Sequence, residues 1–320
     1  MEDKTYNTLK EKLVGIKKEV SLKDYTTYKI GGPAKYFFVA KTKDSLMRAL
    51  EAAKENKLPI FILGGGSNLL ISDKGFNGLV IKIDMPDIKF HGNMALVGAG
   101  ANLTKLAYMT ANDGLLGLEW SAGVPGTVGG AIYGNAQAFG TKISEVVKSV
   151  EALNVKTLET KNFSKKQCHF SLKGSVFKKN KNLIIISAHL QFQEESPERI
   201  KNRIKGFLEY RRAKHPMTFP SAGSVFVNPE IKIKSKKLLD EFPELKEYNK
   251  NKAIPSGYLI AKCGLAGKKI GKAQISEKHC NFIINLGGAK AKDVLALIDL
   301  AQKKVKKVFG VNLEPEIQIL

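Results

Sequence analysis

Cysteine is scarce in this sequence of 320 residues. Only Cys168, Cys263 and Cys280 occur, and none of them form a C-x-x-C pair. This pattern excludes a secreted disulfide framework and predicts reduced thiols, as in the cytoplasm. Long apolar runs are also missing, since none approaches the roughly 20 residues that span a bilayer, and the N-terminus lacks a signal-peptide pattern. We therefore expect a soluble, cytoplasmic protein.

Two of the cysteines stand next to histidines, as Cys168-His169 and His279-Cys280. In principle, four such side chains could form a zinc site. We expect both pairs to lie in strands, where adjacent side chains point to opposite faces, so that one pair cannot easily supply two ligands. The sequence therefore favours a structural role for them and predicts no metal site.

Acidic residues are few relative to basic ones. The chain has 30 Asp and Glu residues against 52 Lys and Arg residues, which gives a formal charge of +22. Such a field attracts polyanions and makes nucleic acid a partner to consider. The lysines are scattered, however, and no helix-turn-helix, zinc-finger or aromatic-stacking signature accompanies them. We interpret the charge as a solvated surface and predict neither a nucleic-acid partner nor a membrane partner.

The chain is long for a single core, so two or three domains are expected. In the first ~85 residues, strand patterns at 36–39 and 59–63 flank a helical pattern at 46–53, which indicates a small α/β unit. A second unit contains strand patterns at 146–155 and 183–192. Acidic and turn-forming residues at 193–197 then precede a helix, and we place a domain boundary there.

The segment after this boundary contains a strand pattern at 281–284 and an apolar helical stripe at 294–308. Lysines in the last turn of the stripe and Gly310 after it predict that the helix ends there. The chain closes with a predicted strand after Pro315.

Two glycine-rich segments are the strongest binding signals. In the segment 63–70, LGGGSNLL, three successive glycines let backbone N–H groups approach an anion such as phosphate. It is neither a G-x-G-x-x-G fingerprint nor a P-loop. The segment 120–135, WSAGVPGTVGGAIYGN, is typical of a backbone that lies flat against a large planar group and a phosphate. Two such loops imply an extended cofactor, although two glycine-rich connections without a ligand would look similar.

These motifs resemble those of the UDP-N-acetylenolpyruvoylglucosamine reductase family, flavoenzymes of peptidoglycan precursor synthesis. The resemblance extends nearly end to end and rests on residues 27–34, 64–76, 123–135, 220–226, 275–282 and 310–316. It implies a mixed α/β and α+β protein: a bipartite FAD-binding domain of the vanillyl-alcohol-oxidase (PCMH) type, followed by a C-terminal α+β substrate domain. The short segment between 177 and 211 is similar to the subgroup that lacks an added substrate-covering loop.

Together with the boundary above, the resemblance predicts three parts. FAD-binding subdomain 1 covers 1–85, subdomain 2 covers 86–195 and is joined by the C-terminal strand 311–320, and the substrate-binding domain covers 196–310. It also implies that FAD takes a hydride from NADPH and passes it to the enolpyruvyl group of UDP-N-acetylglucosamine enolpyruvate, which yields UDP-N-acetylmuramate. We expect a monomer.

The resemblance also assigns the cofactor contacts, in which the two glycine loops cradle the FAD pyrophosphate and flank the flavin. These expected contacts are Gly64, Gly65, Gly66, Ser67, Asn68, Gly123, Val124, Pro125, Gly126, Thr127, Gly129, Gly130 and Asn135.

Three catalytic residues are implied in the same way. Ser224 corresponds to the proton donor of the family, and Glu316 corresponds to its catalytic glutamate. Glu314 is the competing carboxylate, because in a strand the two glutamates would point the same way. Lys173 stands where the family has an arginine that polarises the enolpyruvyl group, and lysine lacks the bidentate fork of arginine. Either Lys173 acts differently, or a neighbouring cation compensates, or activity is reduced.

Substrate contacts are expected at Asn228 and in the basic cluster of Arg211, Arg212 and Lys214, which could bind the UDP diphosphate. Val227 and Ala261 depart from the residues usual in the family. Two other functions stay open: another FAD enzyme of the same fold, such as an alcohol oxidase, and an inactive, flavin-free relative that binds polyanions.

Overall fold

The computed structural model describes residues 3–251 and 253–320. The chain forms two compact units, and both are assembled from separate segments. The first unit consists of Met1–Val20, Pro33–Gly66 and Phe76–Tyr210, and the second of Ser21–Gly32, Ser67–Gly75 and Arg211–Leu320. Two short N-terminal segments therefore belong with the C-terminal part of the chain.

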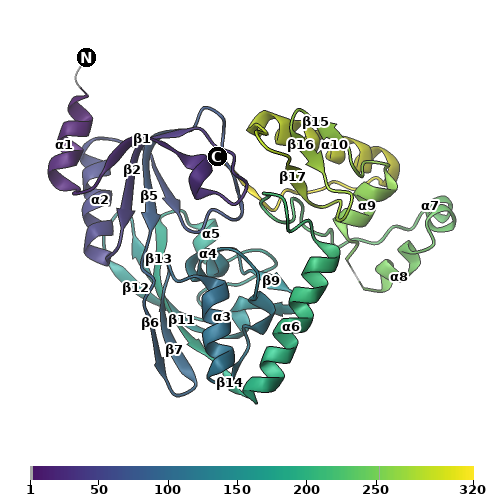
Figure 1. Cartoon of the computed structure of the whole chain (residues 1–320), viewed down its shortest axis with the longest axis horizontal. Helices are drawn as coiled ribbons and strands as arrows, with labels where there is room; N and C mark the ends of the chain where they lie inside the picture. Colours follow the sequence, from purple (N-terminus) through teal and green to yellow (C-terminus); the bar gives the residue numbers. More distant parts are fainter. Residues whose placement is uncertain (1–2, 252) are drawn as a thin grey trace. The chain divides into compact units, whose positions relative to one another are not determined.

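The first sheet of the first unit has the order β1-β2-β5-β3. Its strands are β1 (Lys17–Ser21), β2 (Pro33–Ala40), β5 (Phe76–Ile83) and β3 (Ile60–Leu63), and β5 pairs in parallel with both β2 and β3. Helix α2 (Lys43–Glu55) packs on β2 and β5 (Figure 1). It begins at a capping box in which Thr42 and Ser45 satisfy each other's backbone N–H groups. The strand–helix–strand order predicted for this region is confirmed.

The second sheet of this unit is antiparallel, with the order β12-β11-β13-β7-β6. Its strands are β12 (Thr160–Ser164), β11 (Val147–Asn154), β13 (Leu183–Gln191), β7 (Met94–Gly98) and β6 (Ile88–His91). One core cluster contains buried side chains from both sheets, including Phe38, Ile81, Val150 and Ile185. The two sheets therefore share a single hydrophobic core.

The other elements of the first unit are short, apart from α3 and α6. They are α1 (Lys4–Lys12), α3 (Leu103–Asn112), β8 (Leu115–Leu116), η2 (Glu119–Ser121), α4 (Val128–Tyr133), β9 (Gln137–Ala138), β10 (Thr141–Lys142), η3 (Ile143–Glu145), α5 (Val176–Lys179), β14 (Gln193–Glu194) and α6 (Pro197–Lys214). Ile200 and Ile204 of α6 pack against Ala111 and Ala122. This contact keeps α6 with the first unit as far as Tyr210, so the compact unit extends beyond the boundary predicted at 195.

The second unit is built around helix α10 (Ala291–Phe309), which packs on the antiparallel strands β15 (Lys269–Ile270) and β16 (Ala273–Ile275), with β17 (Ile283–Asn285) beside them (Figure 1). The predicted apolar stripe is buried at Val294, Leu297 and Val305. The helix ends as predicted, at Gly310 with φ 70°. The remaining elements are η1 (Leu22–Tyr25), β4 (Leu69–Leu70), α7 (Lys236–Glu241), α8 (Leu245–Lys250), α9 (Ser256–Lys262) and β18 (Gln318–Ile319).

The C-terminal strand differs from the expectation in length and in place. Only Gln318–Ile319 forms a strand, β18, and it pairs in parallel with β4 of the second unit. Pro315 makes only an isolated bridge, because its ring nitrogen has no hydrogen to donate to a ladder. The division into two FAD-binding subdomains and a substrate-binding domain stays a prediction about function.

The cysteine–histidine pairs lie in turns, so their predicted placement in strands is wrong. The N–H of Cys168 donates to the carbonyl of Ser164 at 3.0 Å, and His169 has a left-handed φ of 45°. His279 and Cys280 lie in the loop before β17. Within residues 3–251 and 253–320, no group of three or more His, Cys, Asp and Glu side chains is arranged to bind a metal ion. In the same residues, no helix has the length and apolar character needed to cross a membrane.

Tyr28 is an unusual member of the core of the second unit. The residue is 0% exposed, and its hydroxyl has no hydrogen-bond partner among the protein groups that the structure describes. Burial also raises the pKa of this phenol, since the charged form loses its hydration. The hydroxyl therefore destabilises the fold, as a buried polar group without a partner does.

Replacing Tyr28 with phenylalanine is expected to raise the free energy of unfolding by about 1–2 kcal/mol, because it removes only the unpartnered hydroxyl. Urea titration followed by circular dichroism measures the change. A loss of stability in Tyr28→Phe would show that the hydroxyl is paired in solution.

Candidate cofactor and substrate site

The two glycine-rich loops touch each other within the first unit. Gly64 to Gly66 follow directly after β3, and a Cβ atom added to Gly65 would lie 2.6 Å from the Cα of Gly126 in the second loop. No side chain fits at that distance. Gly126 also has a φ of 129°, which other residues rarely adopt. The loops predicted from sequence to hold one cofactor are thus brought together by backbone-to-backbone packing.

The second loop is held in place by its own backbone. The N–H of Leu103 donates to the carbonyl of Gly126 at 3.1 Å, and the N–H of Val128 donates to the carbonyl of Ala101 at 2.9 Å. Thr127 begins α4, and its Oγ1 accepts from the N–H of Gly130 at 3.3 Å. The predicted residues Gly123, Val124, Pro125 and Gly129 lie in the same loop or the first turn of α4.

The touching loops offer donors that suit an anion. In the described part of the chain, the backbone N–H groups of Gly65, Gly66, Gly126 and Thr127 donate to no carbonyl. Fixed N–H groups on glycine-lined backbone bind phosphate oxygens, with no side chain to prevent close approach. These residues therefore fit the diphosphate of FAD.

Lys82 of β5 lies beside the first glycine loop. It was not among the cofactor contacts predicted from the sequence. Its Nζ donates to the carbonyl oxygen of Gly64 at 3.2 Å. The signal in the sequence is a lysine inside an otherwise apolar strand run, Leu79 to Ile83.

Two asparagines predicted to contact the cofactor make bonds within the protein. Asn68, which follows Ser67 in the second unit, donates from Nδ2 to the carbonyl of Glu316 at 3.2 Å. Asn135 of the first unit is 2% exposed, and its Nδ2 donates to the carbonyl of Ser171 at 2.9 Å. Both carboxamides thus fix neighbouring segments, and their contact with a cofactor stays a prediction.

The loop that carries Lys173 is tied to the end of the second glycine loop by this bond between Asn135 and Ser171. Lys173 itself is half-buried and has a left-handed φ of 52°. The Nζ of Lys178 donates to the carbonyl of Lys173 at 2.8 Å. The Lys178 ammonium therefore holds the backbone of Lys173, and compensation for the missing arginine stays a prediction.

Ser224 and Glu316 lie on neighbouring segments of the second unit. The N–H of Glu316 donates to the carbonyl of Val225 at 2.7 Å, and the N–H of Val227 donates to the carbonyl of Glu314 at 3.0 Å. Glu316 therefore lies opposite the residue next to Ser224, whereas Glu314 lies farther along the ladder. Glu316 is half-buried and Glu314 is exposed. This register favours Glu316 as the carboxylate near the serine.

Asn281 fixes the segment that carries Ser224. This residue is 3% exposed, and its side chain makes two bonds to the backbone of Phe226, accepting from the N–H at 2.9 Å and donating to the carbonyl at 2.9 Å. Its own carbonyl accepts from the N–H of Val225 at 2.8 Å. The sequence motif contains Asn281, but its role depends on a contact between distant segments that the sequence does not reveal.

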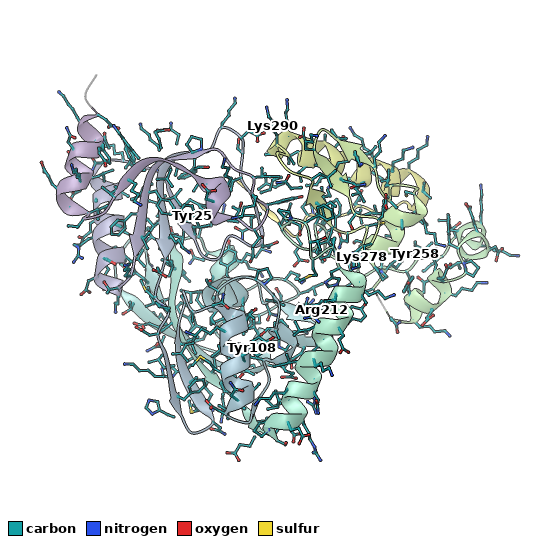
Figure 2. All side chains as sticks on the ribbon, viewed as in Figure 1. Tyr25, Tyr108, Arg212, Tyr258, Lys278 and Lys290 are labelled. Carbon is teal, nitrogen blue, oxygen red and sulfur yellow. The ribbon has the colours of Figure 1, made fainter. Side chains whose placement is uncertain are left out.

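The predicted substrate residues lie at the surface of the second unit. Arg212 and Lys214 are exposed in the last turn of α6, whereas Arg211 is 8% exposed. The Nζ of Lys278 donates to the carbonyl of Arg212, and Figure 2 shows the two residues next to each other. Asn228 is exposed, and its Oδ1 accepts from the first N–H of α9 at Ser256 at 3.0 Å.

Two histidines lie near this basic cluster. The rings of His215 and His279 are 5.4 Å apart. Burial, together with the charges of His279, Arg211 and Lys278, lowers the pKa of His215 to about 4. His215 is thus neutral at physiological pH and adds no charge beside the basic side chains.

Comparison with known proteins finds a match for the N-terminal and the C-terminal part of the chain. The family model of an FAD binding domain matches residues 34–157, and the model of the UDP-N-acetylenolpyruvoylglucosamine reductase C-terminal domain matches residues 215–320. The UDP-N-acetylenolpyruvoylglucosamine reductase of Lactobacillus acidophilus is 37% identical over 313 residues, which is 98% of this chain and 97% of that protein. The chain belongs to the UDP-N-acetylenolpyruvoylglucosamine reductase family.

Other members of this reductase family show the same extent of similarity. The reductase of Anoxybacillus flavithermus is 38% identical over 95% of this chain and 94% of its own length. The crystal structure of the Thermus caldophilus reductase superposes with a TM-score of 0.75 at 31% identity, covering 94% of this chain and 98% of that one. The predicted fold class, an FAD-binding domain followed by the C-terminal domain of this reductase family, is therefore confirmed.

Proposed function

We propose that this protein is an NADPH-dependent flavoenzyme that reduces the enolpyruvyl group of UDP-N-acetylglucosamine enolpyruvate to UDP-N-acetylmuramate in peptidoglycan biosynthesis. The observation that carries the proposal is the pairing of the Ser224 segment with the Glu316 segment, in a chain whose length is covered by this reductase family. FAD, when bound, supplies the chemistry that moves two electrons from NADPH to the enolpyruvyl double bond.

The residues of the chain perform the remaining steps of the reaction. Reduction adds a hydride to the enolpyruvyl carbon farther from the carboxylate and requires a proton at the adjacent carbon. Ser224 donates this proton from its hydroxyl, and the Glu316 carboxyl stabilises or relays it. Lys173, whose backbone carbonyl is held by Lys178, stabilises the negative charge that develops on the substrate carboxylate.

The substrate is held by its diphosphate. Arg212 and Lys214 supply positive charge at the end of α6. Asn228 accepts from α9 with its Oδ1, and within the described residues its amide N–H groups have no partner. The reaction is proposed to take place in the cytoplasm, with the protein as a monomer and without nucleic acid. The free thiols of its three cysteines agree with a reducing compartment.

The first experiment measures flavin content and NADPH oxidation of the purified protein. We expect a yellow protein that releases FAD on denaturation, and NADPH oxidation that rises when the UDP-enolpyruvyl sugar is added. A colourless protein without flavin would contradict both flavoenzyme functions and favour the polyanion-binding relative. Oxidation that is driven by an alcohol and not by the UDP sugar would favour the other FAD enzymes.

Lys173→Met is expected to lower kcat/KM for the UDP-enolpyruvyl sugar by roughly tenfold to a hundredfold, because a charge-assisted contact to the carboxylate is lost. Lys173→Arg should retain most of the activity, since arginine keeps the positive charge of lysine. Steady-state kinetics of both variants test this. A large gain in Lys173→Arg would mean that the lysine impairs the site.

A further inference from the structure

Lys82 occupies an unusual place for a lysine. It lies in β5, which is flanked by β2 and β3 in the first sheet. Leu79, Val80 and Ile81 before it are all 0% exposed, and Ile83 after it is 4% exposed. Inner strands of parallel sheets are usually continuous apolar runs, and lysine is rarely buried without a partner of opposite charge. A half-buried ammonium group here therefore calls for a specific explanation.

The contacts of Lys82 point to the first glycine loop. Leu63, the last residue of β3, is the register partner of Lys82, so the loop begins beside the lysine. The Nζ bond to the Gly64 carbonyl, at 3.2 Å, uses one of three donors of the ammonium group. No carboxylate forms an ion pair with Lys82 within the described residues, although Asp84 is near enough to offset part of the pKa lowering that burial causes.

We propose that Lys82 is a cofactor-binding residue, which fixes Gly64 and supplies a half-buried positive charge beside the loop that binds a diphosphate group. This inference rests on the proposed FAD-dependent function and adds to it a residue outside both glycine loops. The neighbouring donors agree with it, because the N–H groups of Gly65 and Gly66 make no backbone bond in the described chain. A fixed positive charge and free N–H groups together suit a dianionic ligand.

The alternative is that Lys82 serves the fold alone. Lysine suits a purely structural role poorly. An apolar side chain of similar length would fill the same strand position without the cost of desolvating an ammonium group. A role in binding the cofactor, at a cost to the stability of the fold, explains a lysine at position 82 better. The two explanations predict opposite effects on the apoprotein and the holoprotein.

The test compares Lys82→Met with Lys82→Arg and with Lys89→Met. Lys89 is an exposed residue of strand β6 in the same unit, so its replacement removes one charge outside the loops. FAD affinity of each apoprotein is measured by flavin fluorescence, and thermal unfolding is recorded with and without FAD.

Lys82→Met is expected to weaken FAD binding roughly tenfold to a hundredfold, while its apoprotein melts at the same or a higher temperature. Lys82→Arg should recover part of the affinity, and Lys89→Met should stay within about twofold of wild type because surface charge is screened. If Lys82→Met does not fold, Lys82→Gln replaces it, with the same expected loss.

Two results would overturn the inference. One is a Lys82→Met apoprotein that binds FAD as tightly as wild type, and the other is an equal loss in Lys89→Met, which would make net charge the cause. Failure of the proposed function is distinct from both, because in that case the wild-type apoprotein itself would not bind FAD.

Discussion

Replacing Ser224 with alanine is expected to slow the reaction of the reduced enzyme with the UDP-enolpyruvyl sugar by roughly 10²–10⁴-fold, the usual effect of a lost general acid. Flavin reduction by NADPH should be spared. The Ser224 hydroxyl makes no hydrogen bond to a protein group in residues 3–251 and 253–320, so its removal breaks no hydrogen bond there. The loss is therefore expected in the chemical step and not in stability.

Stopped-flow absorbance of the flavin separates the two half-reactions. The enzyme is first reduced anaerobically with NADPH and then mixed with the UDP-enolpyruvyl sugar. Ser221→Ala is a matched control from the same segment, since among the described residues the Ser221 hydroxyl only accepts from the N–H of Gly223 at 3.4 Å. Equal losses in both half-reactions of Ser224→Ala would argue against a proton donor.

Local patterns in the sequence predicted the regular elements well. The apolar spacing at 46–53 corresponds to α2, and the stripe at 294–308 corresponds to α10, which ends at Gly310 as expected. Such periodicities arise because one face of each helix is buried, and they are written in consecutive residues. The glycine loops are local signals of the same kind, and their close contact at Gly65 and Gly126 agrees with them.

What the sequence could not reveal depends on contacts between distant residues. The cysteine–histidine pairs resemble strand residues locally but lie in turns and loops, where the N–H groups of Cys168 and His169 donate to carbonyls three or four residues earlier. The bonds of Asn281 to Phe226 join residues 55 positions apart, and the bond of Lys82 to Gly64 joins strand β5 to the loop after β3. No pattern of consecutive residues predicts a hydrogen-bond partner that is distant in the sequence. A charged residue inside an apolar strand, such as Lys82, can still indicate that a partner exists.

The choice between the two C-terminal glutamates shows the same limit. A regular strand would have placed Glu314 and Glu316 on one face, and the sequence alone could not separate them by geometry. In the structure, the backbone of Glu316 is held from two sides, by its N–H bond to Val225 at 2.7 Å and by the Asn68 bond to its carbonyl at 3.2 Å. The residue is thus fixed beside the Ser224 segment, as a catalytic group requires.

Glu316→Gln is therefore expected to lower the rate of the second half-reaction by roughly 10²–10⁴-fold with little change in flavin reduction, because glutamine keeps the shape of the side chain but cannot hold or relay a proton. Glu314→Gln is the matched control: it is exposed, lies opposite Val227, and should react nearly as wild type. The same stopped-flow experiment measures both variants. If Glu314→Gln loses as much as Glu316→Gln, the backbone register does not decide which carboxylate acts; if only Glu314→Gln loses activity, the catalytic glutamate is Glu314.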